Sequence, residues 1–374
     1  MLQRLWHRIA SPVDPFLGIL LAVLLSFTTV VMLSASPERI QSQLINTLTG
    51  LVITWVVANI SQQKLQSFAL PLYVIGVLLL IAVALFGDVS KGARRWLHVG
   101  VTRIQPSELL KIAMPLMLAW YFQQREGALR AFDFVIALVL LLIPVGLIAK
   151  QPDLGTAILV FSAGLFVIFF AGLSWKLIVP VMLAGIIGVA AIISSQDKIC
   201  DPDVAWPGMK DYQKHRVCTL LDPSSDPLGK GFHTIQSTIA VGSGGVLGKG
   251  WRNGTQAQLE FIPERHTDFV FAVISEEWGL VGNLGLLTVF LLLIYRGLMI
   301  AASAPNQFSR LLAGAISMSF FTYVFVNMGM VTGILPVVGV PLPLVSYGGT
   351  ALVTLCLGLG MLMSIARHKP LLQQ

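Results

Sequence analysis

The stretch from Gln258 to Trp278, QLEFIPERHTDFVFAVISEEW, places acids, bases and aromatic residues directly against an apolar run. An Asp at the start of a helix most often caps it by accepting backbone N–H bonds, and Asp268 alone would fit that role. Its neighbours His266, Glu260 and Glu264 favour chemistry instead, because acids and bases gather there at the edge of an apolar segment. We therefore expect Asp268 to be catalytic and His266 to contact a substrate.

Two further polar clusters lie at the starts of apolar runs. In PSELLK, residues 106–111, Glu108 and Lys111 share one helix face because they are three residues apart. A lysine inside a membrane faces a partner or a cavity, so the pair either satisfies itself or holds Lys111 ready for a phosphate. Asp153, in QPDLGT, is either a helix cap or a substrate contact. The residues alone leave both pairs of alternatives open.

Other common chemistries have no support in the sequence. It contains no Cys/His spacing typical of a metal site, no Walker loop and no dinucleotide fingerprint. Ser346 has no His and Asp arranged around it as a nucleophile would need. Its Pro- and Gly-rich stretch, residues 336–349, is expected to shape a cavity wall or to re-enter a membrane, since glycine permits close backbone approach.

The composition places these clusters in a membrane protein. Of 374 residues, 55% are hydrophobic and 11% are charged, whereas a soluble domain carries about twice that share of charge. The net charge of +7 fits membrane topology and contacts to an anionic ligand. Nucleic acid is not expected as a partner, because no soluble basic domain is present to bind a duplex.

Ten apolar runs are long enough to cross about 30 Å of hydrocarbon. They lie near residues 16–35, 44–60, 68–86, 107–122, 132–149, 154–172, 176–195, 280–299, 308–334 and 344–366. An even number puts both termini on one side, and the Arg- and Lys-bearing short loops there mark that side as cytoplasmic. We predict an all-α integral membrane protein with ten transmembrane helices and one large extracytoplasmic loop between helices 7 and 8. Its parts are 1–195, the loop 196–279 and 280–374.

One outer loop, residues 87–106, carries cations against this orientation rule. Lys91, Arg94 and Arg95 stand there beside Trp96. Cations kept on the outer side suggest a bound anion such as a lipid phosphate. The alternative is a solvated loop.

The segment after Asp268 is too long for a single span. One helix from Asp268 to Met299 would measure about 48 Å, more than a bilayer requires even with tilt. Gly279 and Gly282 offer a break. We expect a short interfacial helix over 268–278, with Thr267 or Asp268 at its N-terminus, and a span from about residue 280.

Cys200 and Cys218 share the large outer loop. An oxidising compartment permits disulfides, so we expect these two residues to be bonded, with about 3 kcal/mol of local stabilisation in the loop-closure model. Two free thiols are the alternative. Cys356 lies in an apolar run and is expected to be a packing residue.

Five blocks together resemble one membrane protein family. They are KGARRWL (91–97), QPSELLK (105–111), QPDLGT (151–156), PERHTDFVFAVISEEWG (263–279) and PVVGVPLPLVSYGGT (336–350). In this order they are similar to the signature blocks of the SEDS family of shape, elongation, division and sporulation proteins, over nearly the whole chain. PERHTDF and the form of the last block resemble the rod-shape branch more than the division branch. Residues 199–209 depart from the family as an insertion.

The resemblance implies a peptidoglycan glycosyltransferase of the bacterial cytoplasmic (inner) membrane. Such proteins polymerise lipid II at the outer leaflet with a class B penicillin-binding protein, a transpeptidase, and other membrane proteins of the elongation complex. The family's essential acid matches Asp268, its polar pair matches Glu108 and Lys111, and its loop Trp matches Trp96. We expect the partner on the exposed faces of spans eight and nine and the loops above them.

Residues and resemblance combine into one mechanism. Asp268 removes the proton of an acceptor sugar hydroxyl as it attacks the anomeric carbon of the donor, with inversion. Cations at the outer interface, namely Lys111, Arg94, Arg95 and Lys91, stabilise the pyrophosphate leaving group. The sequence leaves open a divalent cation between Asp268 and the pyrophosphate and identifies no certain cofactor. A lipid II transporter and a non-catalytic scaffold are the two alternative functions.

Overall fold

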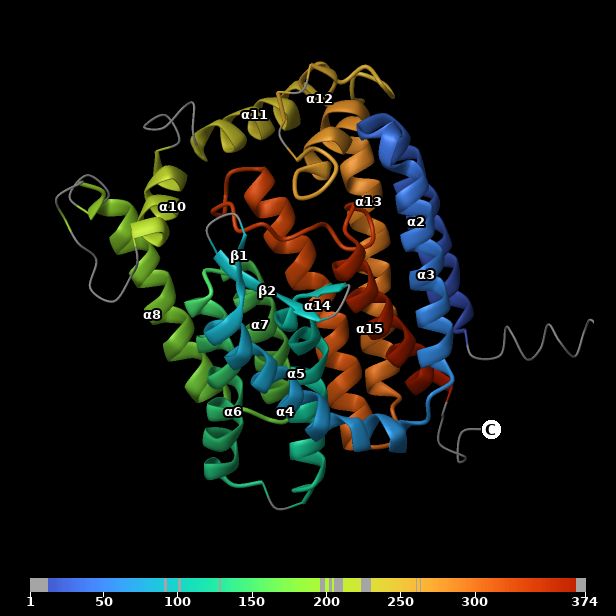
Figure 1. Ribbon diagram of the computed structural model, residues 1–374, viewed down its shortest axis with the longest axis vertical. Coiled ribbons are helices and arrows are strands. Elements are labelled where there is room, and N and C mark those ends of the chain that lie inside the picture. Colours follow the sequence, from blue (N-terminus) through green and yellow to red (C-terminus); the bar gives the residue numbers. More distant parts are fainter. Residues whose placement is uncertain are drawn as a thin grey trace, which may run out of the picture.

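The computed structural model describes residues 13–90, 93–99, 102–127, 129–195, 199–201, 204, 211–222, 230–259, 261–262 and 264–367. Their helices form one bundle, with further short helices over one end (Figure 1). The helices are α2 (Pro15–Ala35), η1 (Pro37–Arg39), α3 (Ile40–Ala58), α4 (Gln62–Phe86), α5 (Pro106–Gln123), α6 (Ala131–Lys150), α7 (Leu154–Phe170), α8 (Trp175–Ser194), α10 (Asp211–Leu221), α11 (Lys230–Ser243), α12 (Thr255–Gln258), α13 (Val270–Ala302), α14 (Gln307–Val331) and α15 (Gly349–Arg367).

The apolar helices agree with a multi-pass membrane protein. Within the described residues, eight helical segments are long and apolar enough to cross a membrane: α2, η1 with α3, α4, α6, α8, α13, α14 and α15. α7 is apolar but shorter, with 17 residues, and α5 has 18 residues with a polar start. Every one of the ten predicted runs overlaps one of these helices.

The loop expected over residues 87–106 contains a small sheet. Strands β1 (Asp88–Ser90), β2 (Ala93–Val99) and β3 (Thr102–Ile104) pair antiparallel in the order β1-β2-β3. The register places Asp88 opposite Trp96 and Leu97 opposite Ile104. β-branched and aromatic residues in this stretch suit a pleated, half-buried surface. The chain is therefore helical in its spans but not all-α in this loop.

The centre of the bundle is formed by α5, which packs against α4, α7 and α14. Most of its side chains are buried, including Leu110, Leu116 and Phe122. On one side of this core α15 runs along α3, where Thr54 Oγ donates to the Cys356 carbonyl across 3.1 Å. Small residues permit such close helix contacts in membranes. By contrast, no residue of the α8 span window is buried, and α8 stands at the edge (Figure 1).

A break divides α13 at Gly279, as the length argument predicts, with φ 62° and ψ −159°. The break leaves backbone carbonyls before it and amides after it without partners inside the helix. The loop after α11 supplies hydrogen-bond partners for them. Lys249 and Gly250 donate their amides to the carbonyls of Glu276 and Glu277 at 3.0 and 2.9 Å. Leu280 in turn donates to the Gly245 carbonyl at 3.0 Å. The 244–250 loop therefore completes the hydrogen bonding of the kink.

Two other sequence expectations differ in detail from the structure. Phe269, not Thr267 or Asp268, occupies the N-cap position of α13. The last helix begins at Gly349, although the apolar run starts at residue 344. Both differences have one cause, because the residues before each helix are held by hydrogen bonds to each other, as described below.

A disulfide joins the segment after α8 to α10. Cys200, just after α8, is bonded to Cys218 of α10, with Cα atoms 5.6 Å apart. Cys356 is buried and free.

Candidate active site

Asp268 lies in a run of turns, residues 264–269, that leads into α13. Its backbone is fixed from α14: the buried Asn327 donates through Nδ2 to the Asp268 carbonyl at 2.8 Å and to the Val340 carbonyl at 2.7 Å. One side chain therefore clamps the acid-bearing turn to the 336–349 loop. Asn327 is fully buried, and its amide donates to both carbonyls at once. These two bonds therefore fix the position of the turn relative to the loop.

The 336–349 loop makes further bonds to the same turn. Ser346 Oγ donates to the Thr267 carbonyl at 2.6 Å, and the Tyr347 amide donates to the His266 carbonyl at 2.8 Å. At Gly339, with φ 75°, a Cβ would lie 3.3 Å from Asp268 Oδ2. The loop thus forms a backbone wall against the carboxylate, and glycine allows that wall to approach it.

Aromatic rings and cations surround the turn. The half-buried His266 meets the Tyr347 ring edge-on with centroids 5.9 Å apart, and the Arg39 guanidinium lies 5.4 Å from the Tyr347 centroid. Burial, and then the positive charge of Arg39, lower the pKa of His266 from 6.5. His266 is therefore neutral at pH 7.

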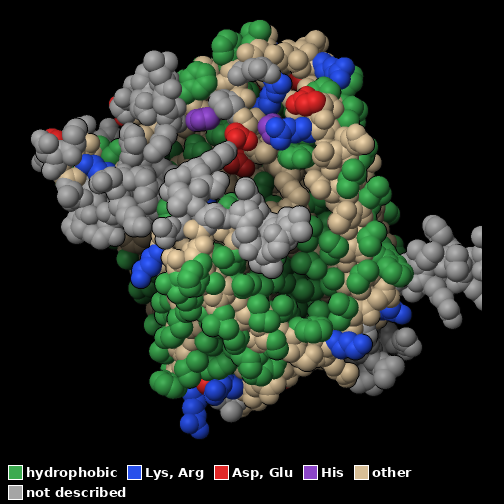
Figure 2. Space-filling view, viewed as in Figure 1, with side chains coloured by type: hydrophobic (Ala, Val, Ile, Leu, Met, Phe, Trp, Pro, Cys, Tyr) green, Lys and Arg blue, Asp and Glu red, His purple; other side chains and the backbone are tan. Residues whose placement is uncertain are grey.

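A second histidine covers the turn from α11. His233 stacks on Phe269, with ring centroids 5.7 Å apart and planes 17° apart. Burial lowers its pKa, while the negative charge of Glu264 opposes that shift. Figure 2 shows acidic, basic and histidine side chains together near the upper end of the molecule, above a broad hydrophobic band. Glu260 lies outside the described residues.

Glu108 and Lys111 form an ion pair on α5, with Nζ and Oε1 2.6 Å apart. Thr354 of α15 donates to the other Glu108 oxygen at 3.2 Å, and Lys111 Nζ lies 5.4 Å from the Tyr323 ring centroid. Lys111, Tyr323 and Thr354 also line a small cavity among α5, α7, α14 and α15. The pair satisfies itself, as the first alternative expects, and the contact of Lys111 with a phosphate stays a prediction.

Of the remaining candidates, Asp153, Arg95 and Trp96 lie near the starts of α5 and α7 and on β2. Asp153 is the N-cap of α7 and accepts from the Thr156 amide at 3.3 Å, while Gln105 Nε2 donates to its other oxygen at 2.9 Å. Arg95 donates from its guanidinium to the Pro152 carbonyl, and Trp96 is half-buried. Lys91 and the side chain of Arg94 lie outside the described part of the structure.

The clusters around Asp268 and around Lys111 are linked by α14. Tyr323, beside Lys111, and Asn327, bonded to the Asp268 carbonyl, are four residues apart and lie on the same face of one helix, about 6 Å apart along its axis. Sequence reasoning missed both residues, although two polar side chains at this spacing inside an apolar run are a detectable signal. It also missed Arg39 and Thr354. Among the described residues, no group of three or more His, Cys, Asp or Glu could hold a metal ion.

Comparisons with known proteins agree along the whole chain. Residues 10–371 match the family described as "Cell cycle protein" (FtsW, RodA and SpoVE). Peptidoglycan glycosyltransferase MrdB of Escherichia coli K12 is 52% identical over 373 residues, which are 99% of this chain and 97% of MrdB. Stage V sporulation protein E of Bacillus subtilis is 34% identical over 323 residues, covering 85% of this chain and 84% of that protein.

Two solved structures share the fold. Rod shape determining protein RodA of Thermus thermophilus matches with a TM-score of 0.69 and 30% identity, covering 95% of this chain and 96% of RodA. A chain reported under "Structural coordination of polymerization and crosslinking by a peptidoglycan synthase complex" matches with a TM-score of 0.77 and 36% identity, covering 95% and 97%. With its five sequence blocks, its helical bundle and these relatives in agreement, this chain belongs to the SEDS family of FtsW, RodA and SpoVE.

Proposed function

We propose that this protein is a peptidoglycan glycosyltransferase that polymerises lipid II for cell elongation and rod shape. The observation that carries the proposal is the 52% identity with MrdB along the full length of both chains. The clamped Asp268 turn supports the same function, because an acid fixed by Asn327 and Ser346 has the geometric definition that catalysis requires.

The proposed topology has ten spans in the inner membrane, with both termini in the cytoplasm. Spans one to seven lie within 1–195, the outer loop with α10, α11 and α12 covers 196–279, and spans eight to ten lie within 280–374. The overlap of ten helices with the ten apolar runs supports this arrangement. A disulfide between Cys200 and Cys218 fits an oxidising outer side.

In the proposed reaction the acceptor hydroxyl oxygen attacks the anomeric carbon of a polyprenyl-pyrophosphate-linked donor. The new glycosidic bond forms as the bond from that carbon to the pyrophosphate oxygen breaks, which inverts the carbon. The hydroxyl proton passes to Asp268, and His266, neutral beside it, binds the sugar or peptide of the substrate.

The leaving pyrophosphate takes the bonding electrons and is stabilised by cations. Lys111 supplies one charge from the cavity wall, oriented by Glu108. Arg95, Arg94, Lys91 and Trp96 supply the rest of the interfacial site, and Asp153 orders the adjoining helix start through Gln105.

The proposed partner is a class B penicillin-binding protein that crosslinks the strands, together with other elongation-complex membrane proteins. An apolar groove between α13 and α14 faces outward on spans eight and nine. Phe271, Leu291 and Phe325 are among its lining residues. A membrane helix of the partner has the apolar surface to fill it.

The deciding test is polymerisation of purified lipid II by the protein reconstituted with its class B partner, whose crosslinking is blocked by a β-lactam. Wild type is expected to make glycan strands, and Asp268→Asn is expected to make none while unfolding at the same temperature. Equal strands from both proteins would remove Asp268 from the reaction. No strands from either would contradict the proposal and favour a transporter or a scaffold, which translocation and complex-assembly assays then separate.

A further inference from the structure

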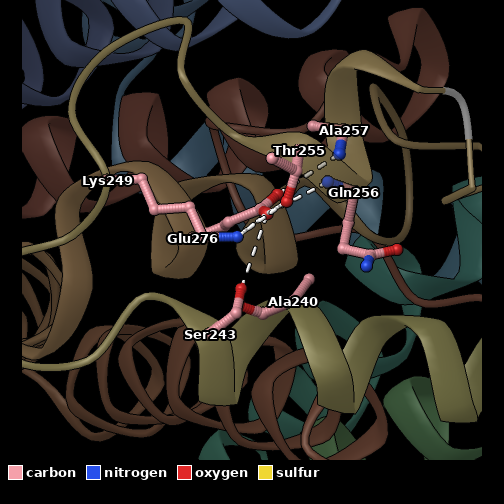
Figure 3. A network of polar contacts seen from close by, with 7 residues as sticks. All are labelled: Ala240, Ser243, Lys249, Thr255, Gln256, Ala257 and Glu276. Carbon is pink, nitrogen blue, oxygen red and sulfur yellow. Dashed lines mark hydrogen bonds and ion pairs between the residues drawn. The ribbon is translucent and has the colours of Figure 1, made fainter.

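Glu276, in the first part of α13, is a fully buried carboxylate held by a dense set of donors (Figure 3). Its Oε1 accepts from Lys249 Nζ at 2.7 Å, from Thr255 Oγ at 3.0 Å and from the Gln256 amide at 3.0 Å. Its Oε2 accepts from the Ala257 amide at 3.2 Å. Four donors, one of them a lysine ammonium, favour the ionised form of this carboxylate. Glu276 is thus an ionised anchor and not a proton-transfer group.

The Glu276 carboxylate binds the start of α12. This helix has only four residues and no side-chain cap of its own at Gly254, and a helix this short is unstable in isolation. Its first amides, on Gln256 and Ala257, have no partners within the helix, and the Glu276 carboxylate supplies them across 19 or 20 residues of sequence. The position of α12 therefore depends on Glu276.

α12 in turn contacts the turn that carries Asp268. The Arg265 guanidinium donates to the carbonyl of Ala257, the same residue whose amide is bonded to Glu276. On its other side the turn is held by Asn327 through the Asp268 carbonyl. The turn thus lies between two supports, α14 with the 336–349 loop on one side and α12 on the other.

We infer that Glu276 is a positioning residue for Asp268, acting through α12 and Arg265. This inference rests on the proposed function. The charge of Glu276 fixes α12, α12 fixes Arg265, and Arg265 holds the turn at the angle that presents the Asp268 carboxylate to the acceptor hydroxyl. Substrate does not need to touch Glu276 for this effect.

The test compares Glu276→Gln with Glu277→Gln in the lipid II polymerisation assay. The two acids are adjacent before the Gly279 break and both are buried, but Glu277 accepts from Ser34 of α2 and not from α12. The Gln amide would place a donor against the donors of α12, so we expect E276Q to lower kcat about tenfold or more with little change in KM. The kcat of E277Q is expected to stay within about twofold of wild type, because Glu277 does not bind α12.

A second variant moves the carboxylate without replacing it. A Cβ at Gly254 would lie 2.9 Å from Glu276 Oε2, whereas at Gly242 nothing lies within 4 Å. Gly254→Ala should therefore reproduce the kcat loss, and Gly242→Ala should not. Because this variant keeps Glu276 intact, the inference stays testable even if E276Q does not fold.

Amide hydrogen exchange provides a readout independent of activity. In E276Q and G254A, exchange should accelerate in peptides covering 255–268 and stay unchanged in α14. Unchanged exchange there, or equal kcat for E276Q and E277Q, would overturn the inference. If wild type itself makes no strands, the proposed function fails, and the exchange result alone then decides whether Glu276 holds the turn.

Discussion

At the scale of single residues, the acid proposed for catalysis is placed by polar groups that do not themselves react. Asn327 and Ser346 bind backbone carbonyls of the turn and not its carboxylate. Hydrogen bonds to the backbone fix the position of Asp268 without neutralising its carboxylate. It also explains why the site depends on residues far apart in sequence.

The lowered pKa of His266 predicts how stability and activity change at acidic pH. Burial, and then Arg39, lower its folded-state pKa below the unfolded value of 6.5. A histidine with a depressed pKa contributes full stability above pH 6.5, and that contribution is lost as the pH falls below 6.5 because the unfolded chain binds the proton first. The melting temperature and activity should therefore decline between pH 6.5 and 5.

His266→Gln should weaken this acid decline without abolishing it, because burial also lowers the pKa of His233. Melting curves and initial rates at half-unit steps from pH 8 to 5 measure the effect. An acid limb of the same steepness in wild type and His266→Gln would contradict the assignment.

At the scale of elements, the break at Gly279 divides α13 into two parts with different neighbours. The first part of α13 packs below α11 and α12, and the second part runs through the bundle along α14 (Figure 1). The 244–250 loop fills the break with backbone bonds to Glu276, Glu277 and Leu280. One loop therefore supports both the kink and, through its continuation into α12, the Asp268 turn.

Gly279→Ala should be strongly destabilising. The residue has φ 62°, which costs a non-glycine residue about 1–3 kcal/mol, and its new Cβ would also collide with the Gly248 nitrogen. Gly285→Ala, in the same helix with nothing within 4 Å of its Cβ, is the matched control and should be neutral or slightly stabilising. Thermal unfolding in detergent compares the two, and equal melting temperatures would show that the break tolerates a side chain.

At the scale of the whole molecule, the bundle leaves two kinds of surface. α5, α14 and α15 are largely buried, while α8 and the outer faces of α4 and α6 are exposed and apolar. Lipid covers such surfaces in a membrane protein. The groove between α13 and α14 differs from them because it is concave as well as apolar.

Leu291→Trp should fill that groove and weaken the complex with the class B partner. Leu291 is 53% exposed, so the larger ring should not disturb the core. Leu142→Trp, on the exposed face of α6 with a 48% exposed side chain, adds the same ring elsewhere. Co-purification from membranes should fall at least about tenfold for the first variant only, and equal recovery of the partner would place its docking surface elsewhere.

The sequence by itself predicted the apolar helices and the break in α13, and it proposed the residues for the chemistry. Hydrophobic runs must cross a bilayer as helices because their backbone groups can be satisfied only internally, so composition is sufficient for that inference. A segment too long for the membrane required the break that Gly279 makes. Helix spacing alone put Glu108 and Lys111 on one face, and the structure shows them paired.

Only the tertiary structure decided what stands around Asp268. Asn327, Ser346 and Glu276 reach the turn or its support from separate elements, and no periodicity relates such distant positions. It also made Asp153 a cap and moved Asp268 one position before the N-cap of α13. The physical reason is that buried backbone groups take whichever partner the packing brings near, and packing is a property of the assembled chain.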